Sequence, residues 1–150
     1  MRIIELDASK WKTSLDFYHA LLAAIGAPKW HGISPDALID SMIWGGINTV
    51  DPPYIVRISG LSTAPKEVRD HVELVKDVLL EGRIYRKRHN GDDVEVSIVS
   101  APTSDAVADD QAAEFRNTVA AVRYEGPDPD LHSIADNLRR KIKLGSSRDR

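Results

Sequence analysis

The sequence predicts an α/β fold in which a small sheet of parallel strands packs against helices. Three short segments rich in apolar and β-branched residues, at 2–6, 54–58 and 94–99, alternate with longer segments whose apolar residues recur every three or four positions. Such alternation is typical of βαβ units, in which the strands run parallel. A length of 150 residues leaves room for one main domain with a hydrophobic core.

The first predicted helix follows the strand at 2–6 and covers residues 13–25. Thr13 or Ser14 can cap its N-terminus, and Gly26 is the expected stop. Its apolar positions follow a helical period: Phe17, Leu21, Leu22 and Ile25.

A second helix is predicted after a loop at 27–33. Its start at Ser34-Pro35-Asp36 combines a favoured N-cap, a proline at the first helical position and an acid in the first turn. The paired glycines 45 and 46 are expected to end it.

A third helix is predicted over residues 65–81, with Gly82 as its stop. Residues 83–89 are interpreted as an extra strand, which the hairpin signal Asn90-Gly91 joins to the strand at 94–99. The alternative is that the helix continues through these residues. The sequence favours the hairpin.

The last fifty residues are predicted to be a helical extension. Helices are expected at 105–124 and 130–144, separated by Gly126-Pro127-Asp128-Pro129, and the tail at 145–150 is expected to be disordered. The helix at 130–144 carries a basic cluster at 139–143 opposite an apolar stripe. That cluster is a solvated face, docks within the chain on its acidic body, or binds RNA or a membrane surface.

Composition indicates a soluble cytoplasmic protein. The chain has no cysteine, which rules out disulfides and thiolate metal sites and fits a reducing compartment. Its apolar runs are too short to span a bilayer, and its first residues lack the layout of a signal peptide. We therefore expect no membrane association.

Charge is distributed unevenly along the chain. Residues 1–110 hold 12 Lys and Arg against 17 Asp and Glu, a net charge of −5, and residues 111–150 hold 8 against 6, a net charge of +2. The acidic part argues against nucleic acid as a direct ligand, because phosphate binding needs a basic surface. An acidic surface favours basic proteins as partners instead.

The carboxylates of two predicted helices are spaced as neighbours on one helical face. Asp36 and Asp40 are four residues apart, and Glu73, Asp77 and Glu81 repeat the same spacing. No Lys or Arg stands three or four positions from Asp36, Asp40, Asp77 or Glu81. These acids form either a surface that awaits a cationic partner or an ordinary solvated helix face.

Nothing in the sequence predicts catalysis, a metal site or a cofactor. The five histidines show no HExxH spacing, and no nucleophile motif, phosphate loop or GxGxxG pattern is present. We therefore expect that the protein is not an enzyme. Trp30, in a loop rich in Pro and Gly, is either an exposed anchor for a partner or folded back on the core.

A loop, the helix after it and a later helix form a longer pattern. The loop has a proline, two aromatic residues and a glycine: Pro28, Trp30, His31 and Gly32. The helix then reads Asp-Ala-Leu-Ile-Asp over residues 36–40. The later helix ends at 77–82 in an acid, three residues, Glu and Gly.

This order and spacing resemble the barstar family, small intracellular inhibitors of a bacterial secreted ribonuclease. The resemblance covers about the first 100 residues. It implies a barstar-like domain at 1–100, a small parallel sheet packed with helices. Residues 101–150 would then be a helical extension, packed on this domain or linked to it.

The resemblance also implies which residues bind the partner. Asp40 is expected to enter the ribonuclease active site, where it would pair with groups that hold the substrate phosphate. Asp36 would lie on the same rim. Trp30 and His31 would form the aromatic pair of the family, and Gly32 would let the backbone approach the enzyme.

Further contacts would come from the later helix and from the helix cap. Asp77 and Glu81 would add flanking acids, with Asp77 the direct contact. Ser34 stands where the family usually has asparagine, so one side-chain contact is changed. His31 replaces a tyrosine, which would add pH sensitivity.

The function implied is a stoichiometric inhibitor, or immunity protein, of a small basic ribonuclease or nuclease toxin. The alternative is an interaction module of the same fold that binds a partner other than a ribonuclease. In that case the C-terminal helices would carry the specificity.

Overall fold

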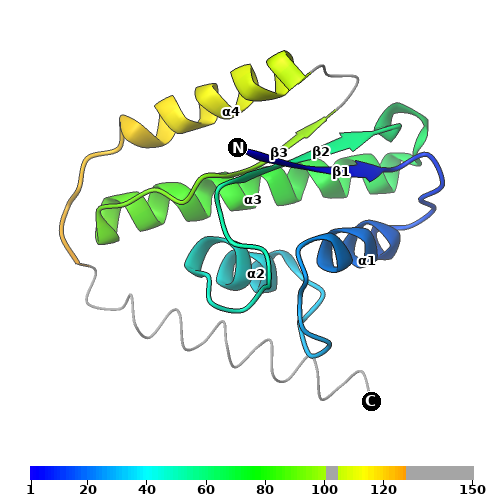
Figure 1. Ribbon diagram of the computed structural model, residues 1–150, viewed down its shortest axis with the longest axis horizontal. Helices are drawn as coiled ribbons and strands as arrows, with labels where there is room; N and C mark the ends of the chain where they lie inside the picture. The colour runs from blue at the N-terminus through cyan, green and yellow to red at the C-terminus, as the bar shows by residue number, and fades with distance from the viewer. Residues whose placement is uncertain (101–104, 128–150) are drawn as a thin grey trace.

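The computed structural model describes residues 1–100 and 105–127, so the predicted helix at 130–144 and the tail at 145–150 lie outside the described residues (Figure 1). At its centre is a sheet of three parallel strands in the order β1-β2-β3. The strands are β1 (Arg2–Asp7), β2 (Tyr54–Ser59) and β3 (Val96–Ser100). The helices are α1 (Ser14–Ala24), α2 (Pro35–Leu38), α3 (Lys66–Asn90) and α4 (Asp105–Ala120), with a π-helical segment η1 (Ile39–Trp44) and a 3-10 turn η2 (Leu61–Thr63). The predicted α/β fold is confirmed.

Helices cover both faces of the sheet. Alternate residues of a strand point to opposite faces, and Val56 and Ile58 join the main core with α1, η1 and α3. Ile55 points the other way and packs with residues of α4. Figure 1 shows α4 on the opposite side of the sheet from α1 and α2. This arrangement explains why Ile55 and Val56, which point to opposite faces of β2, are both apolar and fully buried.

The start and the end of α1 match the sequence pattern. The Asp16 carboxylate accepts hydrogen bonds from the backbone N–H groups of Lys12 at 2.8 Å and Thr13 at 3.2 Å, which satisfies donors at the helix start. Gly26 follows the helix with φ 66°, and a Cβ there would lie 2.6 Å from the Thr49 Cβ. The glycine therefore provides both the backbone conformation and the close approach of residue 49.

The second helix begins as expected but changes its winding. Ser34 Oγ accepts a hydrogen bond from the Ala37 N–H at 3.1 Å, which caps α2. The chain then widens into η1, where the Gly45 N–H donates to the Asp40 carbonyl five residues earlier at 3.2 Å. Gly45, with φ 79°, ends the segment at the predicted place.

The predicted hairpin after residue 82 is wrong, because α3 continues to Asn90. Gly82 lies inside this helix, where a Cβ would be 3.4 Å from the Ile43 Cγ1, so its small size serves close packing against η1. The helix ends at Gly91, with φ 90°. A hairpin turn and a helix C-terminus both need a residue with positive φ. Asn90-Gly91 therefore ends a helix, whereas the sequence analysis interprets it as a hairpin turn.

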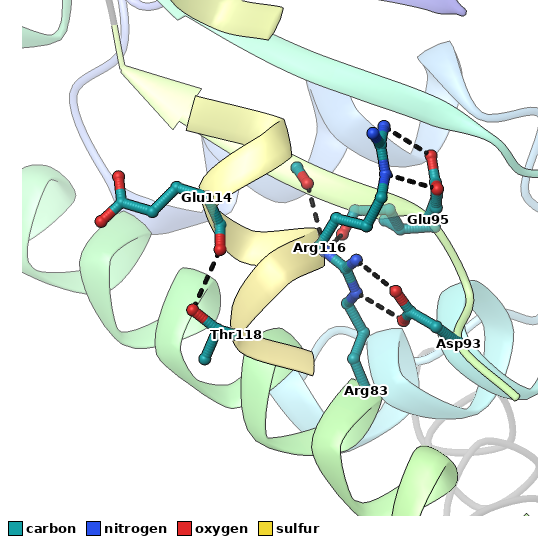
Figure 2. Close-up of polar contacts among 8 residues, drawn as sticks. Arg83, Asp93, Glu95, Glu114, Arg116 and Thr118 are labelled. Atoms are coloured by element: carbon teal, nitrogen blue, oxygen red, sulfur yellow. Dashed lines mark hydrogen bonds and ion pairs between the residues drawn. The ribbon is translucent and has the colours of Figure 1, made fainter. Parts of the chain in front are cut away.

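Buried polar contacts fix the extended part of α3 against β3. The Arg83 side chain is 2% exposed and donates two hydrogen bonds to Asp93, from Nε at 2.9 Å and from Nη2 at 2.7 Å (Figure 2). Its Nη1 donates to the Val96 carbonyl at 3.1 Å and to Ser97 Oγ at 3.3 Å. These four hydrogen bonds form because Arg83 lies on the helix that packs against β3.

The helix α4 covers the second face of the sheet with its own small core. Ala108, Ala112 and Phe115 pack against Ile55 and Val99. At its edge, Arg116 pairs with Glu95, which precedes β3, with Nε 2.6 Å from Oε1 (Figure 2). The helix is shorter than the predicted 105–124, since it ends at Ala120.

Candidate protein-binding site

The helices α2 and α3 and the segment η1 enclose a groove of about 280 Å³. Its lining is Asp36, Ile39, Trp44, Val78, Glu81, Gly82 and Tyr85. Asp36 and Glu81, two of the predicted site residues, are far apart in the sequence and meet here because α3 packs against α2 and η1. The groove is apolar, with these two acids among its lining.

The walls of the groove are held by contacts of η1 with α3. Gly82 has no side chain, so α3 approaches Ile39 and Ile43 closely. Arg86 lies over the Trp44 ring, 5.3 Å from its centroid, and donates to the Ile43 carbonyl at 2.5 Å. A guanidinium so placed is attracted by the ring and holds the indole in position.

The exposed face of α3 beside the groove is acidic. Asp77 and Glu81 are exposed, one helical turn apart, and neither forms an ion pair with any residue in the ranges 1–100 and 105–127. The nearby cations of the helix have other partners, since Lys76 pairs with Glu73 and Arg86 pairs with Asp92. The structure therefore leaves negative charge on this face, as predicted for these two acids, whereas Glu73 is neutralised.

Asp36 and Asp40 differ in exposure. Asp36 is half-buried at the groove, whereas the side chain of Asp40, in the first turn of η1, has 0% of its surface exposed. Asp40 is therefore not part of an open acidic stripe, contrary to expectation. A spacing of four residues predicts that two side chains share a helix face, but it does not say whether that face is covered. The role of Asp40 as the central acid stays a prediction, and it requires that this side chain become accessible.

His31 is a buried link between the loop and η1. Its Nδ1 lies 2.6 Å from the Gly32 carbonyl, which only accepts, so Nδ1 carries a hydrogen and donates. In the neutral ring Nε2 then accepts from the hydroxyl of Ser41 at 2.7 Å. Burial lowers the pKa of His31, and the hydrogen bond to Gly32 opposes this in part. His31 is 4% exposed and both ring nitrogens hold the loop in place, so its contact with a partner stays a prediction.

Trp30 remains the aromatic side chain that this loop presents. The His31 N–H donates to the Pro28 carbonyl at 3.0 Å, which closes a turn with Trp30 at its third position. The indole is 41% exposed, whereas Trp11 is 8% exposed. The interpretation of Trp30 as folded back on the core is therefore wrong.

Two further predicted residues support this region from within. Gly32 is buried, so its backbone is not at an open surface, and its carbonyl is occupied by His31. Ser34 is half-buried and is used as the cap of α2. Their direct contact with a partner stays a prediction.

Sequence reasoning did not identify the apolar walls of the groove. Trp44 is not among the residues predicted to bind a partner, and the strand predicted at 83–89 contains Tyr85. The helical spacing of Val78, Glu81 and Tyr85, at three and four residues, was the available signal, because it places all three on one face of an uninterrupted helix.

The described residues contain neither a cluster of three or more His, Cys, Asp or Glu that could hold a metal ion nor a helix able to cross a membrane. An apolar groove with acids in its lining and an exposed indole on the preceding loop suits a basic protein surface with some apolar area.

Comparison with known proteins agrees with this geometry. The model of the family described as barstar, the barnase inhibitor, matches residues 1–100. No curated protein and no solved structure matches the chain. The matched region contains the sheet, α1 to α3 and the whole groove, and α4 follows it. Since the match spans more than half of the 150 residues, the chain belongs to the barstar family.

Proposed function

We propose that this protein is a stoichiometric inhibitor of a small basic ribonuclease, secreted or acting as a toxin, and serves as its immunity protein in the cytoplasm. The observation that carries the proposal is the meeting of Asp36 and Glu81 in one groove within the region that matches the family. Two acids from separate helices, together with Asp77, provide a negative surface that can face a basic substrate cleft.

The mechanism is occlusion of the active site. Ribonucleases hold the substrate phosphate with cationic side chains, and carboxylates placed against these cations imitate the phosphate. Asp36 and Glu81 supply such carboxylates, and Asp77 extends the negative surface by one helical turn. Trp30 is exposed on the preceding loop and can stack on the edge of the cleft.

Charge also determines how fast such a complex forms. The net charge of −5 over residues 1–110 attracts a basic partner. Steered association of this kind, well known for charged interfaces such as those of this family, reaches about 10⁸ M⁻¹s⁻¹ at low salt and falls steeply as salt screens the charges. A salt-independent rate would contradict the proposed role of the acids.

The test is a titration of the full chain into barnase-like and other small microbial ribonucleases, with RNA cleavage as the readout. We expect an equimolar loss of cleavage activity. Asp36→Asn and Glu81→Gln should each weaken inhibition, because they remove charge from the groove without changing size. Asp70→Asn is the matched control, because this substitution removes an equal charge from α3. Asp70 lies near the start of the helix and pairs with Lys66.

Asp40→Asn completes the variant set. If Asp40 is the central acid, this substitution should cost more affinity than Asp36→Asn, because central desolvated contacts outweigh those at the rim. If Asp40 stays buried in the complex, the substitution should change stability but not affinity. The proposed site would be refuted if Asp36→Asn, Glu81→Gln and Asp40→Asn each weakened inhibition no more than the control Asp70→Asn does.

The second candidate, a module of this family that binds a partner other than a ribonuclease, is favoured by the burial of Asp40 and His31. Both residues belong to the motif through which the resemblance implies ribonuclease binding, and both are covered here. A deletion from residue 105 onward would not separate the two functions, because it uncovers Ile55 and Val99 of the sheet. Failure of the full chain to inhibit any ribonuclease would support this candidate.

A further inference from the structure

The loop at 27–33, which presents Trp30, is anchored by the chain at its two ends. At its start the Ala27 N–H donates to the Leu22 carbonyl at 2.9 Å. At its end the chain enters α2, which Ser34 caps. Between these ends the loop borders a second groove, of about 340 Å³, which it shares with α1. Because this space is open, packing against α1 does not by itself set the position of the loop.

A buried hydrogen bond joins the middle of this loop to η1. Ser41 of η1 is 3% exposed, and its hydroxyl donates to Nε2 of His31 at 2.7 Å. The Leu38 carbonyl is 3.5 Å from the same hydroxyl, so the hydroxyl hydrogen belongs to the shorter contact with His31. The other ring nitrogen, Nδ1, donates to the Gly32 carbonyl at 2.6 Å. The imidazole is therefore held from two sides, by η1 and by the backbone of its own loop.

The segment η1 that holds the imidazole is also a wall of the groove between α2 and α3. It contributes Ile39 and Trp44 to the lining of that groove, and Ser41 lies between them in the sequence. Trp30 directly precedes His31 and is 41% exposed. The hydrogen bond therefore connects the two parts of the surface that the proposed function uses, the exposed indole and the groove.

We propose that Ser41 is a positioning residue for partner binding, which through the His31 ring keeps Trp30 at a fixed place relative to the groove. This role rests on the proposed inhibitor function. A loop that is already ordered in the free protein loses less conformational entropy when it binds. Without the Ser41 hydroxyl, Nε2 of His31 would be a buried acceptor that has lost its donor, which is unfavourable and gives the loop a reason to move. Ser41 acts from inside the molecule and does not itself contact the partner.

The first measurement is the position of the hydrogen on the His31 ring in the natural full chain. Nitrogen chemical shifts of ¹⁵N-labelled histidine distinguish a protonated ring nitrogen from a bare one. We expect the hydrogen on Nδ1 and a bare Nε2 at neutral pH, because the Gly32 carbonyl only accepts and Ser41 donates. A hydrogen on Nε2 instead would overturn the proposal, since the ring would then lack its bond to Gly32.

The second measurement is the mobility of the loop in three variants of the full chain. The order parameters of the Trp30 and Gly32 amides should be about 0.85 in the natural chain and fall below about 0.6 in Ser41→Ala. Ser41→Thr keeps a hydroxyl and should restore them. Ser97→Ala is the matched control, because Ser97 is a 7% exposed serine whose hydroxyl accepts from Arg83 on β3, away from the loop. Unchanged order parameters in Ser41→Ala, or an equal fall in Ser97→Ala, would overturn the proposal.

The variants are then titrated into a ribonuclease that the natural chain inhibits. Ser41→Ala should weaken inhibition by about two- to tenfold, the factor that corresponds to one net hydrogen bond. Ser41→Thr should restore most of the affinity, and Ser97→Ala should inhibit like the natural chain. Full inhibition by Ser41→Ala with a loosened loop would overturn the positioning role and would leave the inhibitor function intact.

Failure of the proposed function would look different. The two resonance measurements contain no ribonuclease, so their results do not depend on inhibition. If the natural chain inhibits no ribonuclease, the inhibitor function is refuted. The order parameters of Ser41→Ala then decide alone whether Ser41 fixes the loop that carries Trp30.

Discussion

The buried ion pair of Arg83 with Asp93 should be the most costly polar contact to break in the described part of the molecule. The Arg83 side chain is 2% exposed and makes four hydrogen bonds, two of them to the Asp93 carboxylate. Asp93→Ala leaves the guanidinium buried with only its bonds to Val96 and Ser97. Removing one partner of a buried pair costs about 3–5 kcal/mol. Because the Asp93 side chain is 18% exposed and water can enter, we expect about 3 kcal/mol.

The adjacent residue provides a matched control. Asp92 pairs with Arg86 at 2.8 Å, but its side chain is 52% exposed, and Arg86 keeps its hydrogen bond to the Ile43 carbonyl when the pair is lost. Exposed pairs contribute about 0–1 kcal/mol. Asp92→Ala removes the same charge one position away and should therefore cost about 1 kcal/mol or less.

Urea unfolding followed by circular dichroism measures both free energies. The double variant Arg83→Met, Asp93→Ala should recover most of the loss, because replacing both charges with apolar groups leaves neither ion buried alone. Equal costs for Asp93→Ala and Asp92→Ala would refute the reasoning. A double variant as unstable as Asp93→Ala would show that the loss comes from packing and not from the isolated charge.

Three further predictions concern His31 and two glycines. Burial lowers the pKa of His31 below its ordinary value of 6.5, so below pH 6.5 the unfolded chain binds a proton that the folded chain resists. The free energy of unfolding, measured in urea, should therefore fall as the pH drops from 7.5 to 5.5, and His31→Gln should reduce that fall. An unchanged pH dependence in His31→Gln would contradict the assignment of this effect to His31. Gly82→Ala should raise the free energy of unfolding by about 0.5–1 kcal/mol, because the new Cβ meets Ile43 at an ordinary contact of 3.4 Å and helix propensity improves. Gly60→Ala should lower the free energy of unfolding by about 1–2 kcal/mol, because φ is 71° there and the Cβ would lie 3.0 Å from the Ser9 nitrogen. Thermal melts check both glycine substitutions: destabilisation by Gly82→Ala or stabilisation by Gly60→Ala would refute the corresponding prediction.

The parts of the fold that local chemistry determines were predictable from the sequence. The apolar strand segments, the cap at Ser34 and the glycine after the first helix all appear within a few residues of their predicted places. Each depends on interactions between neighbours in the chain, such as a side chain that satisfies a backbone donor. The error at Gly82 has the opposite origin. Gly82 lies where α3 packs against Ile39 and Ile43, a contact that no local pattern around residue 82 reveals.

The candidate site was predictable only in part for the same reason. The acids at 36, 77 and 81 were identified from helical spacing, and Asp36 and Glu81 do meet in one groove. The burial of Asp40 and His31 was not identified, because exposure depends on what packs over a helix from elsewhere in the chain. The walls made by Trp44 and Tyr85 were missed because they become walls only when α3 is continuous past Gly82.

The continuity of α3 links the fold to the proposed function. The same helix positions Asp77 and Glu81 at the groove, buries Arg83 against β3 and lays Arg86 over Trp44. A helix that stopped at residue 82 would place the acids at a frayed end, where an acid is unfavourable because of the helix dipole. Continuation to Asn90 puts both acids in the helix interior and lets Glu125, in the segment that follows α4, donate to the Arg88 carbonyl near the end of α3. The acidic face and the packing of α3 on η1 and β3 are therefore positioned by one element, so a substitution that shortens α3 should disturb both together.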